Sequence, residues 1–259
     1  MRVLETRGLG IRFGGLRAVQ ELDLFLDQGE LVALIGPNGA GKTTVFNMLT
    51  GVYKPTEGEI RFFGERIDGM SPYALTRKGI ARTFQNIRLF QQLSVLDNVR
   101  IAHQVNTHHT FIDSILRLPR FGREERRMLE ESRALLETMG LLAVADEAAR
   151  NLSYGQQRRL EIARALATHP KLLLLDEPAA GMNPRETHEL MEMIERVRKT
   201  FGMTILLIEH DMSLVMNISE RIYVLDHGVL IAHGGPEDVR KNPRVIEAYL
   251  GEAAEDALA

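Results

Sequence analysis

Cysteine is absent from the 259 residues, so disulfide bonds, thiolate metal sites and a cysteine nucleophile are excluded. Long hydrophobic runs are absent too. The stretch from Met203 to Ile208, interrupted by Thr204, falls far below the roughly 18 residues that a membrane-spanning helix needs. The opening segment MRVLETRGLG carries charges where a signal peptide would be apolar, so we do not expect export. These absences are typical of a cytoplasmic protein.

The chain also lacks an excess of positive charge. Lys and Arg number 32 against 35 Asp and Glu, which gives a net charge of −3. Because nucleic acids attract strongly basic surfaces, we expect no nucleic-acid partner. The length is sufficient for one large α/β domain with its own core, or for such a domain with a smaller inserted lobe.

Short apolar runs predict the strands of a largely parallel sheet. Each run is bounded by Gly, Pro or charged residues, and the runs are Leu31–Ile35, Leu172–Leu175, Thr204–Ile208 and Ile222–Leu225. Between the last three, helical periodicity predicts helices over Glu186–Thr200 and Met212–Ser219. Alternation of strand and helix is typical of α/β folds with right-handed crossovers.

The N-terminal part has a different pattern. Leu4–Phe13 and Leu22–Leu26 alternate apolar and polar residues, and the turn-forming pair Gly14-Gly15 lies between them. Alternation of this kind is typical of antiparallel strands that have one buried face. We therefore predict an antiparallel β portion at the N-terminus.

Strand patterns are missing from residues 86–150. Within this span, Glu124–Met139 places apolar residues at helical spacing among dense mixed charge. We predict a helical lobe at about 86–150, inserted into a single domain of residues 1–259 that ends in a C-terminal tail at 251–259. The run GREERRMLEESR interleaves acids with bases, so we interpret it as a solvated helix face and not as a basic interaction surface.

A phosphate-binding loop follows the first predicted buried strand. LVALI leads into GPNGAGKTT, which has the phosphate-loop pattern, and then into the helical stretch Val45–Leu49. Glycines let successive backbone N–H groups converge on an anion, and the helix N-terminus adds a favourable dipole. The residues expected around a polyphosphate are Gly36, Asn38, Gly39, Gly41, Lys42, Thr43 and Thr44.

Three side chains of this loop are expected to contact a nucleotide directly. Lys42 should neutralise the β- and γ-phosphates. The Thr43 hydroxyl is placed to ligate Mg²⁺, and Thr44 to hydrogen-bond a phosphate oxygen. A chance glycine-rich turn is the alternative, but the strand before the motif and the helix after it favour the phosphate loop.

Two acids, Asp176 and Glu177, come directly after the predicted strand Leu172–Leu175. In open α/β sheets, ligands bind at the carboxyl ends of the strands. Asp176 is expected to hold Mg²⁺ through water, and Glu177 to polarise the water that attacks the γ-phosphate. The pair alone is a weak signal, but together with the phosphate loop it predicts nucleotide hydrolysis.

The segment Leu152-Ser153-Tyr154-Gly155-Gln156 resembles the signature motif of ABC ATPases. Glycine is usual at the third position, and the branched-chain amino-acid importer branch commonly has tyrosine there. In the family this motif opens a helix that faces the γ-phosphate of ATP held by another subunit. The resemblance therefore implies that Ser153, the Gly155 backbone and Gln156 contact that nucleotide. Ser153 and Gln156 also match a capping box, and both interpretations can hold together.

The same resemblance implies roles for four more residues. Gln85, in RTFQ, corresponds to the glutamine that touches Mg²⁺ and links the core to the helical lobe. His210, after TILLIE, corresponds to the switch histidine that hydrogen-bonds the γ-phosphate. Phe13 corresponds to the aromatic that stacks on adenine, although a core-packing Phe is an open alternative. Many relatives carry Asp where this chain has Asn183, so we expect no acid there at the subunit interface.

The eight histidines do not predict a metal site. His108 and His109 are adjacent, but no carboxylate or third histidine lies at ligand spacing nearby, so we interpret them as surface residues. Among the eight, His210 alone lies at a predicted strand end in the order that the resemblance requires.

The resemblance covers Leu4 to about Gly251. RTFQNIRLFQQLSVLDNV, LSYGQ and EPAAGMNP together resemble the larger ATPase subunit of branched-chain amino-acid importers. The implied fold is α/β, a P-loop NTPase of the ABC type, with a mostly parallel core sheet, an N-terminal antiparallel β portion and an inserted helical lobe. The implied cofactors are ATP and Mg²⁺. The implied partners are integral-membrane permease subunits, a second ABC ATPase subunit and, indirectly, an external solute-binding protein, with this chain peripheral at the cytoplasmic face of the membrane.

Two other functions are left open by the sequence. One is the ATPase subunit of a lipopolysaccharide-extracting or other ABC transporter, which would also lack membrane segments. The other is a soluble ABC protein of translation or DNA repair. Such proteins usually fuse two ATPase units or insert a coiled coil or a zinc hook, and none of these patterns is present.

A crowded apolar run follows Gln85 and predicts a contact surface. Either the run packs entirely inside the helical lobe, or part of it lines a groove for a permease helix. The residues of this run are Ile87, Leu89, Phe90, Leu93, Val95, Leu96 and Val99.

Overall fold

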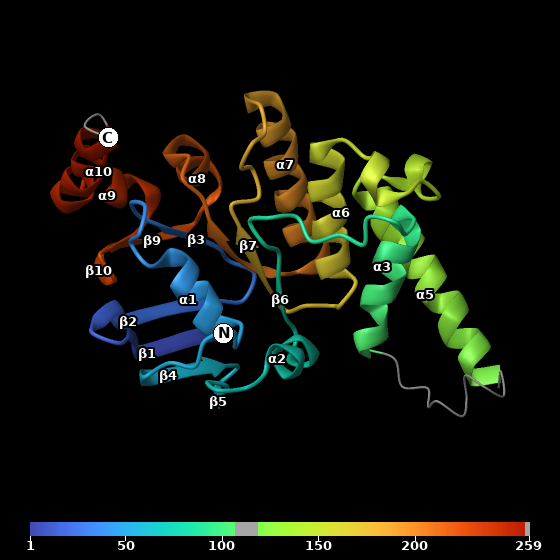
Figure 1. The fold of residues 1–259 in the computed structure, drawn as a ribbon, viewed down its shortest axis with the longest axis horizontal. Coiled ribbons are helices and arrows are strands. Elements are labelled where there is room, and N and C mark those ends of the chain that lie inside the picture. The colour runs from blue at the N-terminus through green and yellow to red at the C-terminus, as the bar shows by residue number, and fades with distance from the viewer. Residues whose placement is uncertain (107–118, 257–259) are drawn as a thin grey trace.

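The computed structural model describes residues 1–106 and 119–256, which form two sheets with helices around them (Figure 1). The smaller sheet is antiparallel, in the order β2-β1-β4-β5. Its strands are β1 (Arg2–Phe13), β2 (Leu16–Asp27), β4 (Glu57–Phe62) and β5 (Glu65–Arg66). The antiparallel portion predicted at the N-terminus is confirmed, and Gly14-Gly15 forms the turn between β1 and β2.

The larger sheet has the order β10-β9-β3-β8-β7-β6. Its strands are β3 (Leu31–Ile35), β6 (Ile80–Arg82), β7 (Leu172–Asp176), β8 (Thr204–Ile208), β9 (Arg221–Asp226) and β10 (Val229–Gly234). All neighbours pair in parallel except β10, which pairs antiparallel with β9 at the sheet edge. The four apolar runs predicted as strands of a mostly parallel sheet are therefore confirmed.

The strand order gathers four chain segments at one edge of this sheet. β8 lies between β3 and β7, and β6 pairs with the outer side of β7. Because these strands are parallel, their carboxyl ends meet at the same edge, which is where α/β folds bind ligands. The segments that leave this edge begin at Gly36, Thr83, Glu177 and Glu209.

Alternate side chains of β7 pack into two different cores. Leu172 and Leu174 pack with α1 (Lys42–Leu49) and the antiparallel strands. Leu173 and Leu175 pack with α6 (Tyr154–Leu166) and α7 (Pro184–Phe201). Successive side chains of a strand point to opposite faces of a sheet. The helix after the phosphate loop and the helix after the signature motif therefore lie on opposite faces of the larger sheet.

A third, smaller core lies at the β10 edge. It joins β3 and β9 to three C-terminal elements, and these are α8 (Met212–Ile218), α9 (Pro236–Arg240) and α10 (Pro243–Asp256). α10 runs into the segment 251–259, for which we predicted a tail, and is helical to Asp256. The C-terminal helices stand together at one end of the molecule in Figure 1.

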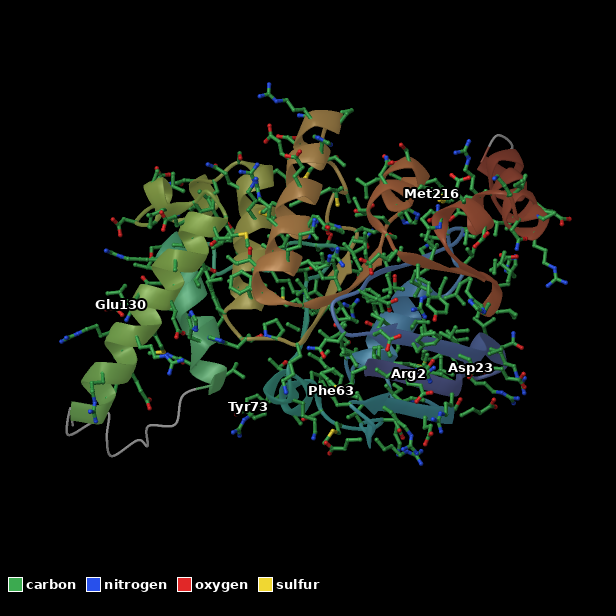
Figure 2. All side chains as sticks on the ribbon, turned by 180° about the vertical axis from the view of Figure 1, so that it is seen from behind. Arg2, Asp23, Phe63, Tyr73, Glu130 and Met216 are labelled. Atoms are coloured by element: carbon green, nitrogen blue, oxygen red, sulfur yellow. The ribbon has the colours of Figure 1, made fainter. Side chains whose placement is uncertain are left out.

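The described residues between 86 and 150 form helices and no strand. They are α3 (Val95–His103), η1 (Gln104–Asn106), α5 (Pro119–Thr138), η2 (Leu142–Val144) and η3 (Ala149–Asn151), while α2 (Pro72–Lys78) precedes β6. α3 packs against α5 and α6. Glu130 points outward from α5 (Figure 2) and is exposed, whereas Met128 is buried, so this helix has the solvated face predicted for it. The boundaries of the lobe stay a prediction, and His108 and His109 lie outside the described residues.

None of the helices in the described part of the chain is both long and apolar enough to cross a membrane.

Candidate functional site

The phosphate loop joins β3 to α1, and two of its glycines are required by close backbone packing. Gly36 and Gly41 have φ values of 150° and 101°. A Cβ on Gly36 would lie 2.0 Å from the Leu225 carbonyl oxygen, and one on Gly41 would lie 2.7 Å from that of Ala18. Only glycine fits such positions. Gly41 is the N-cap of α1 and makes no side-chain cap, so the first-turn N–H groups have no capping side chain and can face an anion.

Lys42 folds back over this loop. Its Nζ donates to the carbonyl oxygens of Gly36 at 2.6 Å and Pro37 at 2.9 Å. Thr43 is exposed and Thr44 is partly exposed in the first turn of α1, and Asn38 is exposed at the tip of the loop. The loop thus carries a cation and two hydroxyl groups at an uncapped helix start, which fits a polyphosphate.

Glu177 is held on both carboxylate oxygens. Nε2 of His210 lies 2.6 Å from Oε1, and Nε2 of Gln85 donates to Oε2 at 2.7 Å. Gln85 follows β6, Glu177 follows β7 and His210 follows β8, so the parallel strands bring together three residues that are far apart in the chain. The three residues predicted to be catalytic are therefore neighbours, and their catalytic roles stay a prediction.

The backbone of Glu177 adopts an unusual conformation. Its φ is 47°, in the left-handed region that non-glycine residues rarely occupy. Its N–H donates to the carbonyl oxygen of Ile208 at 3.0 Å, which ties the turn to the end of β8. Strained residues of this kind cluster at functional sites.

Asp176 is buried, and a cation that we did not predict lies beside it. Nη2 of Arg82 donates to Oδ2 of Asp176 at 2.6 Å, and Nη1 donates to Oδ1 of Asn47 at 2.7 Å. Arg82 ends β6, the strand next to β7. One signal for such a residue was present in the sequence, because a buried carboxylate such as Asp176 needs a positive partner. The ion pair is made through Oδ2 of Asp176, and the water-mediated contact of Asp176 to Mg²⁺ stays a prediction.

Arg158, which sequence reasoning also missed, connects α6 to the segment containing Gln85. It is completely buried. Nη1 donates to the Phe84 carbonyl at 2.7 Å and to Oε2 of Glu161 at 2.8 Å, and Nη2 donates to the Gln85 carbonyl at 2.8 Å. Burial raises the pKa of Glu161, and the charge of Arg158 opposes that rise. The helix that follows the signature motif therefore fixes the backbone that carries Gln85.

The signature segment begins α6 with the predicted capping box, which is confirmed. Ser153 Oγ accepts from the Gln156 N–H at 3.3 Å, and Gln156 Oε1 accepts from the Ser153 N–H at 3.0 Å. Tyr154 donates its hydroxyl to the Ala180 carbonyl at 2.9 Å, so the residue that replaces the usual glycine links this helix start to the loop after Glu177. Ser153 is exposed, and Gly155 lies in the first turn.

Glu209 is a further buried acid at this edge that sequence reasoning missed. It accepts from the Ala179 N–H at 2.9 Å and from the His210 N–H at 3.3 Å. Burial raises the pKa of this carboxyl, and the two N–H donors oppose the rise. Glu209 thereby joins the loop after Glu177 to the segment that carries His210.

The structure shows what surrounds two of the predicted residues, Asn183 and Phe13. Asn183 is the N-cap of α7, where its Oδ1 accepts from the Glu186 N–H at 3.0 Å, a contact that Asn makes as well as Asp. Phe13 is 44% exposed at the end of β1, and its ring meets Tyr53 edge-on with centroids 5.2 Å apart. A core-packing role for Phe13 is therefore wrong, and its stacking on adenine stays a prediction.

Comparison with known proteins identifies the family. The family described as ABC transporter matches residues 19–180. The chain belongs to this family. A second family, described as branched-chain amino acid ATP-binding cassette transporter, matches residues 229–255.

Relatives of this ABC family member match it along nearly its whole length. It is 49% identical over 251 residues to the high-affinity branched-chain amino acid transport ATP-binding protein BraF of Pseudomonas aeruginosa, which covers 97% of this chain and 98% of BraF. It is 51% identical over 251 residues to LivG of Escherichia coli K12, a protein of the same description, with the same coverage. A crystal structure of the ADP conformation of an ABC transporter ATP-binding cassette superposes with a TM-score of 0.85 at 33% identity, covering 97% of this chain and 100% of that one.

The buried pair of Arg82 and Asp176 gives a stability prediction. Arg82→Met keeps an unbranched side chain but leaves the Asp176 carboxylate buried without its cation. We expect the free energy of unfolding, measured by urea denaturation of the nucleotide-free protein, to fall by about 3–5 kcal/mol. Arg66→Met, which breaks the exposed 2.8 Å pair with Asp68, should cost less than about 1 kcal/mol. Similar losses in the two variants would contradict the role given to Arg82.

Proposed function

We propose that this chain binds ATP and Mg²⁺ and hydrolyses ATP as the ATPase subunit of a branched-chain amino-acid importer. One observation carries the proposal: Gln85 and His210 hold the two oxygens of Glu177 at the sheet edge where β3 runs into the phosphate loop. The names of BraF and LivG, and the match over residues 229–255, support branched-chain amino acids over a lipopolysaccharide as the transported substrate.

The residues of the phosphate loop fit the nucleotide. Lys42 already lies over the loop, and its ammonium would exchange the Gly36 and Pro37 carbonyls for the β- and γ-phosphates. Gly39, Gly41 and the first turn of α1, including Thr44, would bind phosphate oxygens, while exposed Phe13 would stack on adenine. Thr43 and Gln85 would hold Mg²⁺, and Asp176 would hold it through water; the bound ion would neutralise charge on the phosphates.

Glu177 is the proposed acceptor of a proton from the attacking water. A general base must be oriented toward that water, and two hydrogen-bonding neighbours on opposite oxygens fix the plane of this carboxylate. His210 is half-exposed and contacts Glu177, and in this proposal its ring would also hydrogen-bond a γ-phosphate. Gln85 connects the same carboxylate to α6, because the backbone carbonyl of Gln85 accepts a hydrogen bond from Arg158.

A second ABC ATPase subunit is proposed to complete each site. α1 and α6 pack on opposite faces of the larger sheet, so one chain presents its phosphate loop and its signature helix in different places. The exposed Ser153, together with Gly155 and Gln156, would contact ATP held by the partner, where the start of α6 offers N–H donors and a favourable dipole.

A permease contact is proposed next to Gln85. The apolar run that follows Gln85 divides in two: Val95, Leu96 and Val99 are buried in the core, whereas Phe90 is 46% exposed and Leu89 is only partly buried. Phe90 is thus the exposed residue of this run, and we propose that it meets a permease helix. We place the chain at the cytoplasmic face of the membrane, where permease subunits receive amino acid from an external solute-binding protein.

The proposed general base is tested by Glu177→Gln. Glutamine keeps the shape and hydrogen-bonding capacity of the side chain but cannot accept the proton, so ATP should still bind while steady-state hydrolysis falls by at least about 100-fold. Glu220→Gln, which removes a carboxylate from an exposed pair with Arg198, should leave turnover unchanged. Turnover within a few-fold of the parent in Glu177→Gln would overturn the assigned role.

The proposed contact across subunits is tested by Ser153→Arg. A large cation at the start of α6 should block dimer closure, so hydrolysis should be lost while calorimetry of the isolated chain shows nearly unchanged ATP affinity. Ser71→Arg alters another N-cap serine, at the start of α2, and should affect neither quantity. Loss of ATP binding and of hydrolysis to the same degree in Ser153→Arg would indicate a purely structural cap.

The permease contact is tested by Phe90→Glu in cells that contain the complete transporter. A charge on this surface should release the subunit from the membrane fraction and abolish branched-chain amino-acid uptake, while the purified chain keeps its fold. Phe201→Glu changes a phenylalanine of similar exposure on α7 and serves as the control. Normal membrane association and uptake in Phe90→Glu would rule this contact out.

A further inference from the structure

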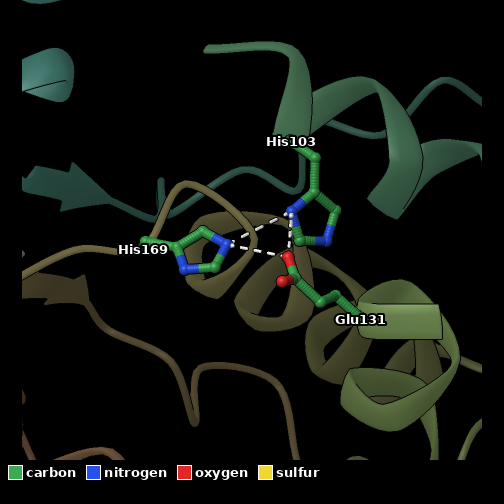
Figure 3. A group of neighbouring side chains, drawn as sticks. All are labelled: His103, Glu131 and His169. Atoms are coloured by element: carbon green, nitrogen blue, oxygen red, sulfur yellow. Dashed lines mark hydrogen bonds and ion pairs between the residues drawn. The ribbon is translucent and has the colours of Figure 1, made fainter. Parts of the chain in front are cut away.

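His103, Glu131 and His169 converge from three separate elements (Figure 3). His103 ends α3, Glu131 lies on α5, and His169 lies in the connection between α6 and β7. This group is near the amino end of β7, whereas Asp176 and Glu177 follow its carboxyl end. The cluster is therefore separate from the candidate nucleotide site and does not depend on the function proposed for it.

The spacing of the three ligand atoms matches a tetrahedral metal ion. Nε2 of His169 lies 3.4 Å from Nδ1 of His103 and 3.3 Å from Oε2 of Glu131, and the third side, from His103 Nδ1 to Glu131 Oε2, is 3.7 Å. Zn²⁺ binds imidazole nitrogen and carboxylate oxygen at about 2.1 Å, and tetrahedral geometry then separates two ligand atoms by about 3.4 Å. One ion can therefore reach all three atoms with little movement.

The chemical state of the ligands also suits a metal ion. Burial lowers the pKa of His103 to about 4, so its ring is neutral at neutral pH and offers a lone pair. Its Nε2 has no hydrogen-bond partner among the described residues. Nε2 can therefore carry the ring proton, which leaves Nδ1 unprotonated. Arg127 Nε donates to Oε1 of Glu131 at 2.6 Å, which orients the carboxylate with Oε2 toward the histidines.

We propose that His103, Glu131 and His169 form a binding site for a divalent transition-metal ion, with Zn²⁺ as the ion whose geometry they match. Imidazole ligands favour Zn²⁺ over Mg²⁺, which prefers oxygen. The three residues line a pocket of about 370 Å³, which has room for a water as the fourth ligand. His169 is half-exposed and gives the ion a path from solvent.

A metal ion at this site would fasten α3 and α5 to the connection that leads into β7. Three ligands from three elements form a cross-link between the helical part and the central sheet. Because the ion binds the folded chain and the ligands are not assembled in the unfolded one, Zn²⁺ should raise the Tm. The site is thus structural or regulatory, with no part in binding the nucleotide.

The test is a titration of the nucleotide-free protein with Zn²⁺ by calorimetry and with Co²⁺ by visible absorption, both in excess Mg²⁺ to occupy oxygen-rich sites. We expect one ion per chain, the intense visible bands of tetrahedral Co²⁺, and a rise in Tm with Zn²⁺. His169→Ala and Glu131→Gln should each weaken Zn²⁺ binding by at least about 100-fold, the upper end of what loss of an outer-shell partner costs. Both residues are partly exposed, so the variants should fold, which circular dichroism checks.

His188→Ala is the matched control. His188 Nε2 also lies 3.4 Å from a glutamate, Glu192, but the pair belongs to no three-ligand group among the described residues, so Zn²⁺ binding should be unchanged. Two results would overturn the proposal. One is a parent protein that binds no Zn²⁺ or gives only the weak spectrum of octahedral Co²⁺. The other is binding that His169→Ala and Glu131→Gln do not weaken.

Discussion

The two hydrogen bonds on the Glu177 carboxylate set the arrangement of side chains at the carboxyl edge of the larger sheet. A carboxylate with one fixed oxygen can rotate, but here one oxygen faces His210 and the other accepts from Gln85. Gln85 follows β6 and His210 follows β8, the two strands that pair with β7. The carboxylate can therefore be held this way only while β6, β7 and β8 keep their parallel register. The left-handed backbone of Glu177 is maintained by the same register, through its bond to Ile208.

A buried charged residue of α6, Arg158, connects this helix to the same edge. Arg158 is inaccessible to water, and each of its bonds to the carbonyls of Phe84 and Gln85 is a charge-assisted contact worth about 1.5–3 kcal/mol. Tyr154, four residues earlier on α6, bonds to Ala180 in the loop after Glu177. A displacement of α6 would therefore either move the backbone at Phe84, Gln85 and Ala180 with it or break these bonds.

Local patterns predicted the phosphate loop, which is one continuous motif, and the strands β1, β2, β3, β7, β8 and β9, which have alternating or apolar runs. The strands β4, β5, β6 and β10 were missed, and β6 has only 3 residues. The residues that complete the site were missed for a different reason, since each acts through a partner distant in the chain. Arg82 and Asp176 are 94 positions apart, and Arg158 lies 74 from Phe84. His103 and His169, 66 apart, likewise show no ligand spacing in the sequence. The sequence left open whether Phe13 is exposed or packed in the core, because an alternating strand pattern does not say where the partner sheet ends.

The three packing clusters give the chain uneven freedom to vary. The C-terminal helices α9 and α10 bury Val239 and Val245 against β9 and β3 in a core of their own, separate from the two clusters that contain α1 and α6. Substitutions there can accumulate, with compensation inside that small core, while the loops at the carboxyl edge keep their positions. The end of the chain can thus be repacked to suit a different partner while the clusters around α1 and α6 keep their own contacts.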